Sequence, residues 1–136
     1  MGARTTARHA ALQLLYAIEV ANEPRHAVIR AFWRETPGDP DGRAYADQLV
    51  QGILDHQETI DGRIRAASEN WRLERMTPVD RNLLRVASYE LEFVDDVPRA
   101  VAIDEAVEIA KRFGTEESSK FINGVLERIA SDLNAL

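Results

Sequence analysis

The sequence predicts an all-α protein, a compact bundle of about seven helices. In seven segments of the 136-residue chain, apolar residues recur at the spacing of three and four that places them on one face of a helix. No segment shows the alternation of apolar and polar residues that is typical of a half-buried strand. The prolines stand between these segments or at their first residues, where helices begin and end.

Composition places the chain among ordinary folded proteins. It is 45% hydrophobic and 29% charged, and a chain of this length usually forms one domain, so we expect a single domain over residues 1–136. The absence of cysteine excludes disulfides, thiolate metal sites and a cysteine nucleophile. No apolar run is long enough for a membrane span, and the N-terminus lacks the apolar core of a secretory signal. We therefore expect a cytoplasmic protein.

Charge is distributed unevenly along the chain. The net charge is −6 at pH 7, yet residues 1–34 carry five arginines and only two acids, and no acid precedes Glu19. The chain thus has a basic N-terminal arm on an acidic body. Nucleic acid remains a candidate ligand, because the local distribution of charge matters more than its sum.

Two helices are predicted before the first loop. The helix over residues 5–21 can be capped by Thr5 or Thr6, and its inward face is a stripe of Ala7, Ala11, Leu14, Leu15 and Ile18. Its polar residues then lie mostly off that stripe; they are Arg4, Arg8, His9 and Gln13. A second helix begins at Glu23-Pro24, with an inward face of Val28, Ile29 and Phe32 and an outward face of Arg25, Arg30 and Arg34.

The middle of the chain holds a loop and two further helices. Residues 36–42 contain the densest cluster of proline, glycine and aspartate and are predicted to form a loop. Helices over residues 43–56 and 58–68 follow, and the second is anchored only by Ile60, Ile64 and Ala67. Trp71 and Leu73 then form an apolar clip that leads into the next helix.

The helix over residues 76–94 is expected to be the central rod of the bundle. Thr77 supplies a capping hydroxyl, Pro78 has the φ of a first helical residue, and Asp80 adds negative charge to the first turn. The apolar stripe of this helix consists of Val79, Leu83, Val86, Leu91 and Val94. Its other side carries the polar residues Asp80, Arg81, Arg85 and Tyr89.

Two helices complete the bundle. The helix over residues 101–113 has Asp104 and Glu105 in its first turn and stops at Gly114. The helix over residues 116–133 contains Asn123-Gly124, a common turn signal, but the apolar period runs through it unchanged. We therefore interpret Gly124 as a helical residue that lets a neighbouring helix approach closely.

The sequence contains no catalytic or metal-binding motif. The three histidines are scattered without ligand spacing, and glycine-rich phosphate loops and a serine elbow are absent. Carboxylate pairs lie at helix boundaries, where capping and the helix dipole explain them. We therefore expect a protein that is not an enzyme and that holds neither a cofactor nor a metal.

Two groups of residues are candidates for binding. The first combines cations, an amide and an aromatic ring, the side chains that contact RNA backbones and stack on unpaired bases; it comprises Arg4, Arg8, His9, Gln13 and Tyr16. A solvated helix face with a half-buried tyrosine is the alternative interpretation. The second group lies where the last two helices meet and comprises Phe113, Gly114, Glu117, Lys120 and Phe121. Its phenylalanines are also explained by packing in the core.

Three motifs in this order resemble the NusB family of bacterial transcription antitermination factors. They are ARHAALQLLY at residues 7–16, VDRNLLRVASYEL at residues 79–91 and VPRAVAIDEAVEIAKRFGTEESSKFINGVL at residues 97–126. The resemblance implies an all-α fold of two small helical subdomains and a non-enzymatic RNA-binding adaptor. Its implied partners are NusE, which is a small-subunit ribosomal protein, and the single-stranded boxA element of nascent transcripts, notably ribosomal RNA leaders. NusA, NusG and RNA polymerase are implied as indirect partners.

The resemblance also assigns roles to individual residues. Those that fall on the RNA-binding first helix are Arg4, Arg8, Gln13 and Tyr16, and Asp80 matches an acidic RNA-contacting position. The residues that fall where members contact RNA or NusE are Phe113, Glu117 and Phe121. Many relatives have consecutive arginines before the first motif, whereas Thr5-Thr6 interrupts the run here. We therefore expect the arm alone to bind RNA weakly and to depend more on NusE.

Two other interpretations stay open. Ribosomal RNA cytosine methyltransferases can carry a similar helical domain at their N-terminus, although this sequence has neither a glycine-rich cofactor site nor a cysteine nucleophile. The other is a helical adaptor that associates with itself. A homodimer would not exclude the RNA-binding role.

Overall fold

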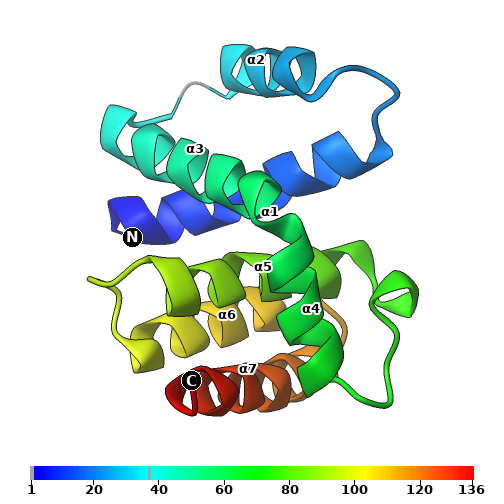
Figure 1. The fold of residues 1–136 in the computed structure, drawn as a ribbon. Coiled ribbons are helices and arrows are strands. Elements are labelled where there is room, and N and C mark those ends of the chain that lie inside the picture. Colours follow the sequence, from blue (N-terminus) through cyan, green and yellow to red (C-terminus); the bar gives the residue numbers. More distant parts are fainter. Residues whose placement is uncertain (1, 37) are drawn as a thin grey trace.

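The computed structural model describes residues 2–36 and 38–136, and these residues form seven α-helices, one short 3-10 helix and no strand (Figure 1). The elements are α1 (Ala3–Val20), α2 (Arg25–Glu35), α3 (Pro40–Asp55), α4 (Gln57–Ala67), η1 (Leu73–Arg75), α5 (Pro78–Phe93), α6 (Arg99–Phe113) and α7 (Ser118–Asn134). The predicted all-α bundle of seven helices is confirmed.

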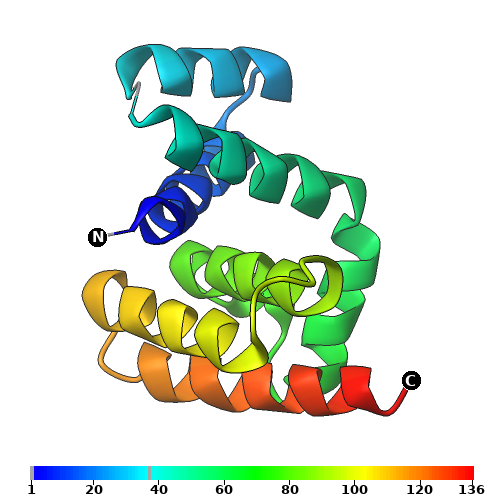
Figure 2. The same cartoon turned by 90° about the vertical axis from the view of Figure 1, so that its left-hand side faces the viewer.

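The helices form two subdomains, as the family resemblance implied. α1 packs against α2 and α3, whereas α4, α6 and α7 gather around α5. Figure 2 shows the first group above the second, with the end of α3 leading directly into α4 at one side. The two subdomains meet where α1 and α3 contact α5.

α5 is the central helix, as predicted, but it has no polar face toward solvent. It contacts α1, α3, α4, α6 and α7, and even its polar residues Asp80, Tyr89 and Glu90 are buried. The polar side of the predicted helix therefore lies within the packing as well. Its side chains bind neighbouring helices. For example, Arg85 Nε donates to Asp61 of α4 over 2.8 Å.

Capping chemistry explains where two helices begin. At α5 the Thr77 hydroxyl accepts a hydrogen bond from the Asp80 N–H (3.1 Å) and Pro78 is the first helical residue, as predicted. At α3 Asp39 accepts from the Gly42 N–H (3.1 Å) and Pro40 is the first helical residue. The predicted loop over residues 36–42 is therefore wrong in its second half. Pro37, which belongs to the same predicted loop, lies outside the described residues.

α1 and α6 begin earlier than the sequence suggested. α1 starts at Ala3 with Gly2 before it, so neither Thr5 nor Thr6 caps the helix. The Thr5 hydroxyl instead donates to Glu105 over 2.5 Å. α6 starts at Arg99, which places Asp104 and Glu105 in its second turn rather than its first.

Two tryptophans differ from their predicted surroundings. Trp71 was expected to be apolar packing beside Leu73, but 63% of Trp71 is exposed while Leu73 is buried. Trp33 was not assigned to the core, yet it is the one residue of α2 that is buried, and its indole N–H donates to Asp47 of α3 over 2.7 Å. The predicted inward residues of α2 are only partly buried; they are Val28, Ile29 and Phe32.

The expectations about two glycines are confirmed in part. Gly124 is helical, as predicted, but a Cβ built there would meet nothing within 4 Å, so the expected close approach of a neighbouring helix is wrong. Gly114 does end α6, and a Cβ there would lie 2.5 Å from Ser118 Oγ and 2.8 Å from the Ala110 carbonyl oxygen. Glycine is therefore needed at this turn because of close contact.

Within the described part of the chain, none of the helices combines the length and the apolar character that crossing a membrane requires.

Candidate functional site

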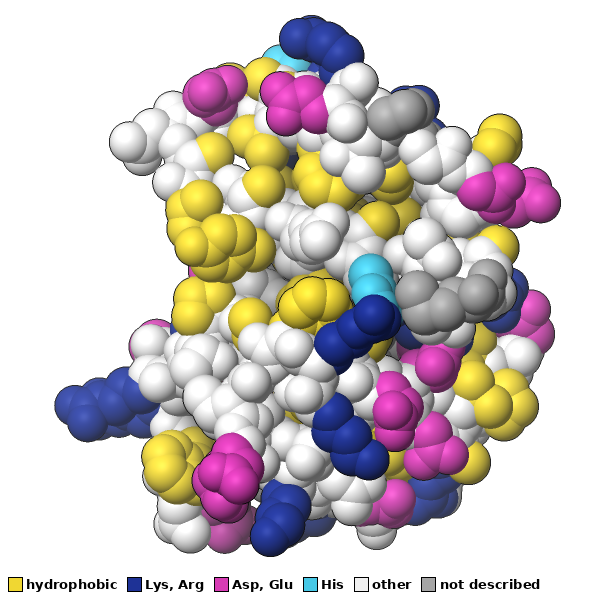
Figure 3. Space-filling model, turned by 180° about the vertical axis from the view of Figure 1, so that it is seen from behind, with side chains coloured by type: hydrophobic (Ala, Val, Ile, Leu, Met, Phe, Trp, Pro, Cys, Tyr) yellow, Lys and Arg dark blue, Asp and Glu magenta, His cyan; other side chains and the backbone are white. Residues whose placement is uncertain are grey.

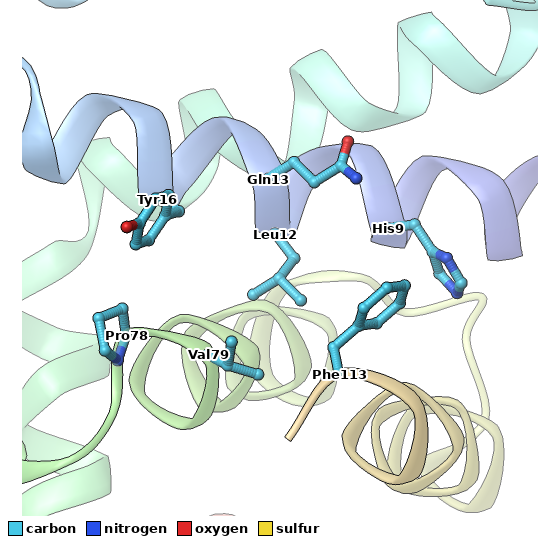
Figure 4. A pocket seen from close by; sticks show the side chains of 7 residues that line it. All are labelled: His9, Leu12, Gln13, Tyr16, Pro78, Val79 and Phe113. Atoms are coloured by element: carbon cyan, nitrogen blue, oxygen red, sulfur yellow. The ribbon is translucent and has the colours of Figure 1, made fainter. Parts of the chain in front are cut away.

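An open groove of about 420 Å³ lies where α1 crosses the start of α5 and the end of α6. Figure 4 shows the side chains that line it, which are His9, Leu12, Gln13, Tyr16, Pro78, Val79 and Phe113. Hydrophobic side chains also gather across the middle of the face in Figure 3, with a histidine and Lys or Arg side chains beside them. We call the surface lined by these seven residues the groove.

Local sequence explains why these residues meet. The α1 residues 9, 12, 13 and 16 follow the three- and four-residue spacing of one helix face. Pro78 and Val79 reach the groove because they form the first turn of α5, and Phe113 because it is the last residue of α6. Tyr16 and Phe113 are about half exposed, at 48% and 47%. Two aromatic rings are therefore available to a ligand at the groove.

His9 sits at one end of the groove, against Phe113. The two rings meet edge to face, with 5.5 Å between their centroids. Burial lowers the pKa of His9 below its ordinary value, and the nearby positive charge of Arg112 lowers it further. A lowered pKa favours the neutral imidazole, which suits a groove with mainly apolar walls.

A second concave surface of about 230 Å³, which we call the hollow, lies on the other side of the first turn of α5. Its lining includes three predicted site residues, Asp80, Glu117 and Phe121, together with Trp71 and Arg75. Asp80 is 9% exposed, and its Oδ1 has no hydrogen-bond partner among the described residues. The start of α5 therefore separates the groove from the hollow.

Arg8 does not lie on the surface, and the expectation that it falls off the buried stripe is wrong. It is 4% exposed. Its Nε donates to both carboxylate oxygens of Glu90 in α5 (2.9 and 3.0 Å), and its Nη1 donates to Glu105 in α6 (2.7 Å). Tyr45 of α3 donates its hydroxyl to the same Glu90 carboxylate, and burial and this hydrogen bond raise the pKa of Tyr45.

Arg8 therefore ties together the helices that carry the groove. Carboxylates from both α5 and α6 compensate its buried charge, which is why an arginine can occupy a core position. A direct contact between Arg8 and RNA phosphate would require these ion pairs to open.

Arg4 is exposed but is not among the residues that line the groove. It pairs with Asp96 at 3.1 Å, and its guanidinium stands 4.3 Å from the centroid of the Tyr45 ring. The rise of a helix places it roughly 18 Å along α1 from Tyr16. The structure thus joins Gln13, Tyr16 and Phe113 in the groove, and leaves Arg4 at the other end of α1.

Sequence reasoning missed several residues of this surface. Leu12, Pro78 and Val79 line the groove. Leu12 had been given no role, and the other two had been assigned only to the start of a helix and to its apolar stripe. The spacing of Leu12 from His9 and Tyr16 was an available signal, since three and four residues separate neighbours on one helix face. Trp71 lines the hollow, and no local pattern shows that its ring is exposed.

Within residues 2–36 and 38–136, no three histidine, aspartate or glutamate side chains stand close enough together to hold a metal ion. The fold and these surfaces define a class, the all-α proteins built from two packed helical subdomains with an open, ligand-accessible surface at their junction. The chain belongs to the NusB family, whose model matches residues 5–131.

Individual relatives support this assignment. The transcription antitermination protein NusB of Sorangium cellulosum is 58% identical over 133 residues, which cover 98% of this chain and 95% of that protein. The structure of T. maritima NusB is 42% identical with a TM-score of 0.86, and the match covers 95% of this chain and 91% of that one. A crystal structure of antitermination factors NusB and NusE in complex with double-stranded RNA contains a chain that is 28% identical with a TM-score of 0.85. That match covers 96% of this chain and 97% of the other.

Proposed function

We propose that this protein is a cytoplasmic, single-domain transcription antitermination factor that binds RNA together with NusE and has no catalytic activity. Its relatives carry the name of an antitermination protein, and one similar chain is found in a complex with NusE and RNA. The observation that carries the proposal is the pair of concave surfaces on either side of the start of α5. All the residues to which the family resemblance assigned a role line them, except the two arginines.

The chemistry of these surfaces suits single-stranded RNA, and we propose the boxA element of nascent ribosomal RNA leaders as the ligand. Half-exposed aromatic rings such as Tyr16 and Phe113 offer stacking faces to unpaired bases. The carboxylates of Asp80 and Glu117 repel phosphate but accept hydrogen bonds from base edges or ribose hydroxyls. Such a surface reads bases rather than coating a phosphate backbone. The complex with NusE would then join NusA and NusG on RNA polymerase.

The first two turns of α1 contribute few free cations to this binding. Arg4 is paired with Asp96, and Arg8 is paired with Glu90 and Glu105. Because each cation that neutralises a phosphate adds salt-dependent affinity, these two paired arginines add little. We therefore propose that stable binding of boxA requires NusE.

A gel shift at physiological salt tests the proposal. The protein with NusE is expected to retain boxA RNA and to release a scrambled sequence, whereas the isolated protein binds weakly. Equal affinity of the isolated protein and of the NusE complex would refute the proposed dependence on NusE. If the NusE mixture fails to retain boxA RNA, the self-associating adaptor becomes the better interpretation, and sedimentation of the free protein then measures the homodimer.

Tyr16→Ala is expected to weaken boxA binding by about 1–3 kcal/mol, the usual contribution of one stacked base. Tyr16 lines the groove and is half exposed, so its loss removes a stacking face without opening the core. Fluorescence anisotropy with labelled boxA RNA and saturating NusE measures the change. Val20→Ala is the matched control, because Val20 is 60% exposed on the same helix and is not among the groove residues. A loss for Tyr16→Ala no larger than for Val20→Ala would count against stacking.

A further inference from the structure

Trp71 lies in the connection between α4 and η1, at the edge of the hollow. We propose that Trp71 is a stacking platform for an unpaired base of single-stranded RNA, and that the RNA path continues across the hollow. The inference rests on the proposed function and adds a contact that neither the family motifs nor the groove supplies. Three observations support it: the exposure of the ring, the charges around it, and a nearby hydrogen-bond acceptor, Asp80 Oδ1, that has no donor among the described residues.

The indole is unusually open to solvent for a side chain of its size. Trp71 is 63% exposed, whereas Trp33, the other tryptophan, is 5% exposed. Its ring meets Phe121 edge to face, with 5.9 Å between the centroids. A single exposed hydrophobic residue is normal on a protein surface and would carry no inference by itself. An aromatic ring propped by a second ring, however, presents a fixed π-face to a ligand.

Cations and carboxylates both stand around the ring, and three of the cations are not paired among the described residues. Arg72, Arg75 and Lys120 each line a depression that Trp71 also borders. None of the three has a carboxylate within 4.0 Å in the part of the chain that the structure describes. By contrast, the nearby Arg65 and Arg128 are paired with Glu74 and with Asp132. Unpaired cations around an aromatic ring are the arrangement that single-stranded nucleic acid requires.

The hollow also contains an acceptor without a donor. Asp80 is nine-tenths buried at its edge, and Oδ1 makes no hydrogen bond to any described residue. A buried carboxylate oxygen without a partner is costly, so a ligand that donates a hydrogen bond there gains affinity. The amino group or ring N–H of a nucleobase is such a donor.

These features together favour RNA over a protein segment. A basic peptide could satisfy Asp80, but it would meet the unpaired charges of Arg72, Arg75 and Lys120. An acidic peptide would suit those cations, but it would bring carboxylates toward Asp80 and Glu117. An RNA strand carries phosphates for the cations, and a base that can both stack on Trp71 and donate to Asp80.

Fluorine NMR tests the inference directly. The protein is labelled with 5-fluorotryptophan, which gives one signal for each of its two tryptophans, and Trp71→Phe assigns them. Unlabelled NusE is added first and single-stranded boxA RNA second. The Trp71 signal is expected to shift when the RNA is added, while the signal of the buried Trp33 stays in place and reports an intact fold.

Affinity measurements give a second readout. Trp71→Ala is expected to weaken boxA binding in the presence of NusE about tenfold or more, and Trp71→Phe is expected to retain most of the affinity because it keeps a stacking face. Val101→Ala is the control, since Val101 is 42% exposed at the other end of α6 and is not among the residues of the hollow.

The outcomes separate this inference from the proposed function. If the NusE mixture binds boxA RNA but the Trp71 signal does not move and Trp71→Ala binds as tightly, the inference fails and the proposed function stands. A shift of the Trp71 signal on addition of NusE alone would assign the hollow to the protein partner and overturn the inference. If the NusE mixture binds no RNA, both the proposed function and this inference fail.

Discussion

Arg8→Met should lower the free energy of unfolding by about 3–5 kcal/mol, the range for removing one partner of a buried ion pair. Arg8 and Glu90 are 4% and 1% exposed, so the substitution leaves the Glu90 carboxylate buried without a cation. Among the described residues, only the Tyr45 hydroxyl still donates to it. Equilibrium unfolding in urea, followed by circular dichroism, measures the loss.

Arg4→Met is the matched control for this prediction. Arg4 lies on the same helix and also pairs with a carboxylate, but the Arg4 and Asp96 side chains are 44% and 70% exposed. Exposed pairs contribute little, so the expected loss is below about 1 kcal/mol. Adding Glu90→Gln to Arg8→Met should recover part of the stability, because it removes the uncompensated charge. Equal losses for Arg8→Met and Arg4→Met would show that the buried network does not hold the subdomains together.

The Arg8 network also connects stability to the candidate site. Through Glu90 and Glu105, Arg8 joins α1 to α5 and α6. The same three helices supply the walls of the groove. An arginine that was expected to contact RNA therefore has a structural position in this protein. The stacking faces of Tyr16 and Phe113 depend on the crossing of α1 over α5 and α6, which the buried ion pairs hold in place.

Helix positions were predictable from sequence, because the apolar period and the capping residues are local. Thr77-Pro78 marked the start of α5 correctly. The same chemistry at Asp39-Pro40 was overlooked, since the surrounding prolines and glycines pointed to a loop. A helix cap depends on one residue and its hydrogen bond. A prediction that rests on the number of helix-breaking residues therefore misses the start of the helix.

The surroundings of polar residues were not predictable in the same way. Arg85 and Arg8 look like surface residues in the sequence, because their partners lie far away along the chain. Arg85 pairs with Asp61, and Arg8 pairs with Glu90. Whether an arginine faces solvent or a buried carboxylate is decided by helix packing, which a local pattern does not contain.

The candidate site shows the same limit. Helical spacing alone placed Gln13 and Tyr16 on one face of α1. The hollow is assembled from residues near 71, 80 and 121, which belong to three separate segments. The residue pattern already offered the segment near residue 121 as a candidate, only the family resemblance added Asp80, and nothing in the sequence pointed to Trp71 as a site residue. Its ring is exposed because the chain turns between α4 and η1 so that Leu73 rather than Trp71 faces the core.

Gly52→Ala should destabilise the protein by about 2 kcal/mol, although alanine is the better helix former. A Cβ at residue 52 of α3 would overlap the ring of Tyr89 in α5. The ring cannot easily turn aside, because it stacks on Phe93 (5.2 Å between centroids) and Phe93 stacks on His56 (4.4 Å). Overpacking of this kind costs roughly 1–3 kcal/mol, which exceeds the gain of up to about 1 kcal/mol from helix propensity.

Gly124→Ala is the control that separates these two effects. Gly124 is also helical, but a Cβ there meets nothing within 4 Å, so the same substitution should stabilise the protein by about 0.5–1 kcal/mol. In a Tyr89→Leu background, Gly52→Ala should lose most of its cost, because the ring that it would overlap is gone. If Gly52→Ala instead stabilised the native protein as much as Gly124→Ala, α3 could not lie against α5 as closely as the structure has it. The junction that carries the groove would then be looser than the packing of Tyr89 on Gly52 implies.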